Sequence, residues 1–260
     1  MGILDKLLKR TAPKPDSVTS GGSNIYHYTD KENKEWRPPV AYGEHAEEIS
    51  DYFSKLFPDH EEFVFHEIIS DLVHIDVNIR RPNEKQNYYF IYTTGMSDLP
   101  MSLPAGYEDR DDMKYAELYA FMPPTWNPGE NFQLSSDIPE SEYWLIHMMK
   151  YLARFPHEYE TWLGAGHTIP NGPDYEPICE GTTMGGVVLS QLGDALECIE
   201  TKDGKRINFL MVIPAYKEEI EYKLKYGMGE LDKKFSENNM QLVIDIHRPN
   251  YCEDFKEILD

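Results

Sequence analysis

The chain has 260 residues, and its 40% hydrophobic and 27% charged residues are typical of a folded globular protein, which excludes disordered and fibrous classes. Its 46 acidic and 25 basic residues give a formal net charge of −21, which disfavours nucleic acid as a partner because phosphates would be repelled. The three cysteines lie far apart without a zinc-ligand spacing, so we expect reduced thiols.

The opening segment, MGILDKLLKR, places its apolar residues at helical spacing and is followed by a stretch rich in Pro, Ser and Gly. It contains no apolar run long enough for a signal-peptide core or a membrane span. We therefore expect a cytoplasmic protein without a membrane span. Residues 1–24 are predicted to be a flexible tail with a short amphipathic helix, and residues 25–260 a single domain.

The first globular element is a predicted helix, EHAEEISDYFSKLF, in which Ile49, Phe53 and Leu56 share one face and which Pro58 ends. EEFVFHEI and DLVHIDVNIR follow as predicted strands, the second by strict alternation of apolar and polar residues. NYYFIYTT and KYAELYAFMP are two further strands, rich in aromatic residues and separated by a long loop.

A second helix is predicted from SEYWLIHMMKYLARF and ends at Pro156, after which HEYETWLGAGHTIPNGPDYEP is too rich in Gly and Pro for regular structure. Two strands follow at 186–192 and 207–213, then a helical run interrupted at Gly227 and Gly229, and a last strand, QLVIDIH. Hairpin-connected strands with inserted helices predict an α+β fold, with a mixed, mainly antiparallel sheet and flanking helices.

The best candidate for a metal site is the acidic and histidine-containing segment around the second strand. Its members are His66, Glu67, Asp71, His74 and Asp76, of which His74 and Asp76 share one face of the strand. The H-E-x-x-H spacing is missing, and a polar strand face that meets water explains the same pattern. We therefore predict no metal and no cofactor.

The sequence contains residue types that hydrolases use, but not in a recognisable catalytic motif. His157, His167, Ser190 and Cys179 occur without a G-x-S-x-G nucleophile turn, and GTTMGG lacks the G-K-[ST] ending of a phosphate loop. No catalytic residue is assigned, and we predict that the protein is not an enzyme.

The loop after the second helix is the best candidate for a binding site, because it sets aromatic side chains among polar ones on a segment held by a scaffold. We assign partner binding to Tyr159, Trp162, His167 and Asn171. The alternative is that Trp162 fills the core while the glycines only let the chain turn.

Five blocks in this order resemble the suppressor of fused family: FHEIISDLVHIDVNIRRP, YYFIYTTGMSDLPM, KYAELYAFMPPTW, YLARFPHEYETWLGAGHTIPNG and RINFLMVIPAYKEEIEYKLKYGMGEL. The resemblance covers about Tyr42 to Asn250 and includes the unusual TGMSD and GHTIPNG loops. It implies an α+β domain without known catalytic activity. Eukaryotic members clamp a transcription-factor peptide, and bacterial members are proposed to be immunity proteins in polymorphic toxin systems.

Two departures bear on what the resemblance implies. Eukaryotic relatives carry a further C-terminal domain, whereas this chain ends soon after Pro249, so we do not expect a clamp between two such domains. Eukaryotic relatives also place an acidic residue that they use to bind the peptide before the loop histidine, where this chain has Gly166 before His167. We expect a protein that binds and neutralises a partner protein, and the partner we expect is a basic toxin domain. A regulatory scaffold for a peptide or transcription factor is the alternative, and an uncharacterised hydrolase the third; the oligomeric state stays open.

Overall fold

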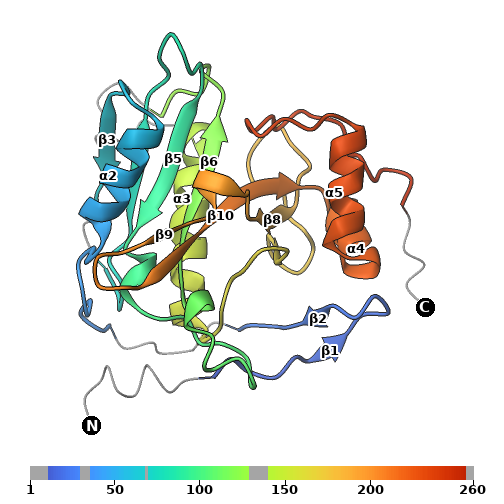
Figure 1. The fold of residues 1–260 in the computed structure, drawn as a ribbon. Helices are drawn as coiled ribbons and strands as arrows, with labels where there is room; N and C mark the ends of the chain where they lie inside the picture. Colours follow the sequence, from blue (N-terminus) through green and yellow to red (C-terminus); the bar gives the residue numbers. More distant parts are fainter. Residues whose placement is uncertain (1–10, 30–35, 68–69, 129–139, 256–260) are drawn as a thin grey trace.

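The structure is a computed structural model of the chain and describes residues 11–29, 36–67, 70–128 and 140–255 (Figure 1). In these residues an eight-stranded sheet runs in the order β3-β4-β5-β6-β10-β8-β7, with β9 paired to β10. β6 and β10 are parallel, and the other neighbours in the sheet are antiparallel. The predicted α+β class with a mainly antiparallel sheet is confirmed.

The strands of the large sheet are β3 (Glu62–Phe65), β4 (Asp76–Arg80), β5 (Tyr89–Thr94), β6 (Tyr115–Met122), β7 (Thr168–Pro170), β8 (Gly186–Ser190), β9 (Cys198–Glu200) and β10 (Arg206–Ala215). The α-helices are α2 (Ala46–Leu56), α3 (Glu140–Glu158), α4 (Lys217–Tyr226) and α5 (Met228–Glu237). Single 3-10 turns form η1 (Met96–Asp98), η2 (Asp111–Met113) and η3 (Asp194–Leu196), and β1 (Ser17–Val18) pairs with β2 (Asn24–Ile25) in a separate hairpin.

Helices cover both faces of the sheet, so its strands bury side chains on both sides (Figure 1). On β5, Ile91 joins the core under α3, while Phe90 and Tyr92 join the core under α2. The ring of Phe53 on α2 lies 4.9 Å from Phe90 and 4.7 Å from Tyr92 between centroids, which is the packing distance of aromatic pairs. The apolar face predicted for this helix is therefore the face that meets the sheet.

The segment after α3 is more regular than the sequence predicts. The helix continues to Glu158 with Pro156 inside it, because the N–H of Tyr159 still bonds to the carbonyl of Phe155 at 3.1 Å. Ten residues later β7 adds an edge strand to β8. The prediction of an irregular loop is wrong at both places, since tertiary contacts override local Gly and Pro content.

The prediction of a last strand at QLVIDIH is also wrong. It meets β6 at a single parallel bridge between Phe121 and Val243, with the Ile244 N–H bonded to the Phe121 carbonyl at 2.8 Å. β6 ends one residue later at Met122, before Pro123, so no further backbone donor is in place to extend the ladder.

The described part of the predicted flexible tail is ordered against the domain. Thr19 Oγ1 donates to the carbonyl of Leu224 at 2.7 Å. Gly21 lies so close to the end of α4 that a Cβ atom would approach the Lys225 carbonyl oxygen to 2.1 Å. The described residues of the predicted tail therefore contact the end of α4, and the division into a tail at residues 1–24 and a domain at residues 25–260 stays a prediction. The amphipathic helix predicted before it lies outside the described residues.

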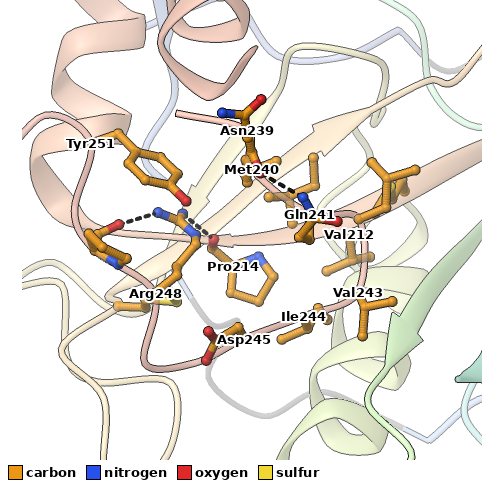
Figure 2. A pocket seen from close by; sticks show the side chains of 15 residues that line it. Val212, Pro214, Asn239, Met240, Gln241, Val243, Ile244, Asp245, Arg248 and Tyr251 are labelled. Carbon is orange, nitrogen blue, oxygen red and sulfur yellow. Dashed lines mark hydrogen bonds between the residues drawn. The ribbon is translucent and has the colours of Figure 1, made fainter. Parts of the chain in front are cut away.

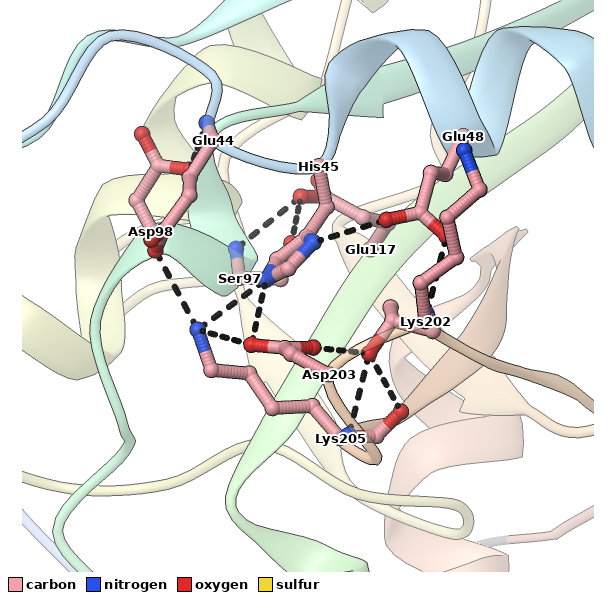
Figure 3. A network of polar contacts seen from close by, with 10 residues as sticks. Glu44, His45, Glu48, Ser97, Asp98, Glu117, Lys202, Asp203 and Lys205 are labelled. Carbon is pink, nitrogen blue, oxygen red and sulfur yellow. Dashed lines mark hydrogen bonds and ion pairs between the residues drawn. The ribbon is translucent and has the colours of Figure 1, made fainter.

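A buried carboxylate shapes the turn after β5 (Figure 3). Glu117 on β6 is fully buried and accepts hydrogen bonds from the Thr93 hydroxyl, the Gly95 N–H, and both the N–H and the hydroxyl of Ser97, at 2.6–3.0 Å. Burial raises the pKa of this carboxyl to about 7, although the Ser97 and Thr93 donors act in the opposite direction. The unusual TGMSD block is thus a turn wrapped around Glu117.

The same turn joins two other parts of the fold. Asp98 accepts the backbone N–H groups of Gly43 and Glu44 at 2.7 and 2.8 Å, just before α2 begins. On the opposite side, buried His157 near the end of α3 lies with Nε2 2.8 Å from the Met96 carbonyl, so that nitrogen carries the proton. Burial lowers the pKa of His157 to about 4, which keeps its imidazole neutral at pH 7.

Gly95 is the position in this turn where a side chain cannot fit. Its φ is 104°, and an added Cβ would lie 1.9 Å from the His74 carbonyl oxygen. We predict that Gly95→Ala lowers the free energy of unfolding by more than about 2 kcal/mol, since both the backbone and the contact are strained. Gly193→Ala is the matched control, because nothing lies within 4 Å of that Cβ. Urea denaturation measures both, and equal stabilities would contradict the role of Gly95.

Glu117 also predicts a pH dependence of stability. Its folded-state pKa of about 7 lies above the ordinary 4.5, so the unfolded chain ionises first as pH rises. The contribution is therefore favourable below about pH 4.5, is lost between about 4.5 and 7, and amounts to about 3 kcal/mol. In urea titrations across this range, Glu117→Gln should gain stability relative to the parent as pH rises. Parallel curves for the two proteins would show that Glu117 does not titrate in this window.

Candidate functional site

The loop from the end of α3 to β7 is held at its base by backbone contacts to the segment after η1. The N–H of Ser102 bonds to the Thr161 carbonyl at 2.9 Å, and the N–H of Leu163 meets Sδ of Met101 at 3.4 Å. Thr161 and Leu163 are both buried. The loop therefore leaves a fixed base, and its half-buried side chains are displayed from a rigid support.

Trp162 and His167 form a pair in this loop. Their ring centroids lie 4.3 Å apart in an edge-to-face arrangement, and both residues are half-buried. The indole covers Gly164 so closely that an added Cβ would lie 2.7 Å from it. One side of Trp162 packs on the main core, so this side chain both fills space and stays partly accessible.

His167 is a neutral imidazole at physiological pH. Burial lowers its pKa to about 4, and the positive charge of Lys223 on α4 lowers it further, against a hydrogen bond with the Trp162 backbone. The pKa of Lys223 is itself lowered by burial. The site thus pairs an uncharged histidine with a partly desolvated lysine.

β7 is an edge of the sheet and directly follows this pair. Thr168, Ile169 and Pro170 face Val188, Val187 and Gly186 of β8, and no strand in the described parts of the chain pairs with the other side of β7. The N–H of Leu189 bonds to the His167 carbonyl at 2.8 Å, which makes these two a hydrogen-bonded pair. In an antiparallel ladder the next residue, Thr168, directs its N–H and C=O away from β8.

Helices α4 and α5 form the wall beside this edge. Met228 at the start of α5 approaches Gly166, where an added Cβ would lie 3.6 Å from the methionine side chain. Ile220 on α4 lies against Gly186 of β8, at 2.8 Å from the Cβ that this glycine lacks. The edge is therefore bounded on one face by α4, and of its two outward-directed residues, Thr168 and Pro170, only Thr168 carries a backbone N–H.

The other two predicted partner-binding residues are used within the fold. The amide Nδ2 of Asn171 donates to the carbonyls of Glu176 and Pro177 at 3.0 and 3.1 Å, which closes the turn after β7. The ring of Tyr159 packs against Tyr28 at 5.2 Å. The structure brings Trp162 and His167 together, and it places Tyr159 and Asn171 in separate structural contacts.

Sequence reasoning missed the edge strand and Lys223. The three residues of β7 are too few for a periodic pattern, and only pairing with β8 identifies them as a strand. Lys223 lies in a polar helical run, where nothing distinguishes it from its neighbours. Sequence patterns also could not indicate the contact of Tyr28, whose hydroxyl lies 2.7 Å from the Thr161 hydroxyl, because more than a hundred residues separate the two.

The polar strand face considered as a metal site is an internal hydrogen-bond cluster. Asp76 lies 3.0 Å from His66 and 3.2 Å from His74, and the other ring nitrogen of His74 meets the Ser70 hydroxyl at 2.7 Å. In the described residues no group of three or more His, Cys, Asp or Glu side chains could hold a metal ion. Within the same residues, no helix is long and apolar enough to span a bilayer.

A cavity of about 150 Å³ lies elsewhere, between β10 and the extended segment 239–249 (Figure 2). Its polar side is built on Arg248, which forms a two-pronged ion pair with Glu219 of α4 at 2.6 Å. Arg248 also donates to the Pro214 carbonyl at 3.0 Å (Figure 2). Because Arg248 and Glu219 satisfy each other, they leave no free charge for a ligand, and we assign this cavity to the fold.

A sequence model of the suppressor of fused protein family matches residues 71–249, so the chain belongs to this family. No curated protein sequence matches the chain. A suppressor-of-fused homologue from Neisseria gonorrhoeae has a similar fold, with a TM-score of 0.57 at 16% identity over 79% of this chain and 95% of that one.

Two further solved structures share the fold. Sufu in its crystallised complex with Fu gives a TM-score of 0.56 at 13% identity, covering 83% of this chain and 95% of that one. Drosophila Suppressor of Fused gives 0.55 at 16% identity, covering 80% of this chain and 51% of that one. The resemblance read from the five sequence blocks is confirmed.

The neutral state of His167 can be measured directly. We predict that its imidazole titrates near pH 4 in proton NMR, and that Lys223→Gln raises the midpoint because it removes a positive charge. Lys217→Gln, at the other end of the same helix, is the control and should leave the midpoint unchanged. A parent midpoint near the ordinary value of 6.5 would show that His167 is solvated and the site more open than described.

Proposed function

We propose that this chain is a non-enzymatic, cytoplasmic protein-binding module that binds and neutralises a partner protein. The observation that carries the proposal is the unpaired edge of β7 beside the Trp162–His167 pair. An edge strand can take an extended partner segment as an additional strand, with backbone hydrogen bonds for affinity and neighbouring side chains for selectivity. Trp162 supplies the aromatic anchor that such interfaces use.

The charge of the chain favours a basic partner. Asp174 and Glu176 are exposed in the turn that follows β7, and the whole chain carries a formal charge of −21. An acidic surface accelerates association with basic proteins, and nucleases are basic because they bind phosphates. A nuclease-type toxin domain is therefore the partner we propose first.

A regulatory scaffold is the second proposal, and membership of the family supports it. Sufu, which shares this fold, is crystallised in complex with Fu, so the fold serves protein binding in at least that relative. A scaffold would use the same edge strand but would hold a peptide without blocking an active site. Inhibition of the partner's activity separates the two functions.

The first proposal is tested by measuring binding to the basic toxin domain that we expect to be encoded beside this chain. The association rate should fall steeply with salt, and Trp162→Ala should raise the dissociation rate about 30-fold or more, as loss of a hot-spot side chain does. Thr168→Pro should also weaken binding, because it removes the outward N–H of β7 without removing a bond to β8.

Tyr107→Ala is the matched control, since this tyrosine is an exposed aromatic residue in another loop. All variants are compared after their melting temperatures confirm folding. Unchanged dissociation rates for folded Trp162→Ala and Thr168→Pro would exclude the β7 edge as the interface. A complex that leaves the toxin active would favour the scaffold.

A further inference from the structure

A second surface with the character of a binding site lies in the segment before α2, away from the β7 edge. Trp36 is 64% exposed, Val40 38% and Tyr42 71%. Exposure alternates along the segment, so that Trp36, Pro38, Val40 and Tyr42 face solvent while the residues between them are half-buried. We name these four exposed residues the apolar stripe. Scattered exposed apolar residues are ordinary, but a row of them marks an interaction site.

Hydrogen bonds to the backbone of Ser70 and Leu72 hold the stripe at the end that begins with Trp36. The N–H of Leu72 bonds to the Arg37 carbonyl at 2.9 Å, and the N–H of Val40 bonds to the Leu72 carbonyl at 3.2 Å. The indole N–H of Trp36 donates to the Ser70 carbonyl at 2.8 Å, so the ring is fixed in orientation although most of its surface is exposed.

The other end of the stripe is fixed as well. The ring of Tyr42 packs against His74 with centroids 5.4 Å apart, and the next residue, Gly43, donates its N–H to Asp98 at 2.7 Å. Exposed aromatic side chains that are already ordered lose little entropy on binding, which is the property of binding anchors. The stripe is therefore built as a preorganised surface.

Charge beside the stripe indicates what it binds. The chain runs from Tyr42 directly into the acidic start of α2, where Glu47 is exposed and the 56% exposed Glu44 is paired with Lys205 at 3.1 Å. The one basic side chain within the stripe segment, Arg37, is paired with Asp71 at 3.4 Å. A ligand for this surface combines apolar side chains with Lys or Arg at one end.

We propose that the apolar stripe is a second docking surface, which binds an extended segment of another protein that carries apolar residues followed by Lys or Arg at one end. A second copy of this chain fits poorly, because both copies would bring an acidic helix start and a formal charge of −21. The stripe precedes residues 71–249, the part matched by the family, so it goes beyond the function proposed for β7.

Selection from a library of random peptides against the full chain tests the proposal. The expected peptides carry apolar residues followed by Lys or Arg. A selected peptide should bind the Trp36→Ser, Tyr42→Ser double variant about 30-fold more weakly or worse, as loss of hot-spot side chains predicts. Tyr107→Ser removes another exposed aromatic side chain and should leave the affinity unchanged. Trp162→Ala should also leave it unchanged, which separates this test from that of the β7 edge.

Three results would overturn the proposal. The first is selection of no peptide, or of peptides that bind the folded double variant equally well. The second is a dimer of the parent that the double variant breaks, which would assign the stripe to a second copy. The third is a higher peptide affinity in Leu4→Ser, Leu7→Ser, which would show that the chain's own first residues occupy the stripe.

Discussion

The fold depends on the buried Glu117 carboxylate, since the turn around it connects three elements. A carboxyl group in the core is costly unless its lone pairs are satisfied, and here four donors from residues 93–97 meet it. The turn that supplies these donors also presents the Met96 carbonyl to His157 and Asp98 to the start of α2. Through His157 the carboxylate positions the end of α3, from which the candidate loop leaves.

The position of the β8–β7 edge depends on where β6 and β10 stop pairing with each other. They pair up to Tyr119 and Met211, after which β10 continues beside β8 while Phe121 meets Val243. Pro214 on β10 has no N–H to offer, and its carbonyl is bonded to Arg248. Because Arg248 is in turn paired with Glu219, this ion pair holds α4 beside the end of β10 and therefore beside the β8–β7 edge.

Whether an element could be predicted from the sequence depends on how far apart in the sequence its contacting residues lie. Elements that follow from local periodicity were predicted, such as the helix with Ile49 and Phe53 on one face and the helix break at Gly227. The second interruption predicted at Gly229 is wrong, since this glycine lies inside α5. Elements that depend on residues distant in sequence were not predicted correctly. The three residues of β7 form a strand only because β8 pairs with them. QLVIDIH has the pattern of a strand, but it meets β6 at a single bridge because β6 ends at Met122.

The candidate site likewise contains residues that the sequence predicts and residues that it does not. Trp162 and His167 could be selected because aromatic and polar residues stand together in one loop, and the structure brings their rings into contact. The same rule selected Asn171, whose amide closes a turn instead. Thr168 and Lys223 have no sequence signal, since an outward backbone N–H and a desolvated lysine are products of tertiary structure.

We expect the outer edge of β7 to be free in the isolated chain and to be filled by a partner strand in the complex. Amide hydrogen exchange, resolved at single residues, measures this directly. We predict fast exchange at the Thr168 N–H beside slow exchange at Ile169 in the free protein, and strong protection of Thr168 in the complex with the proposed toxin partner. Protection of Thr168 already in the free protein, or none in the complex, would contradict it.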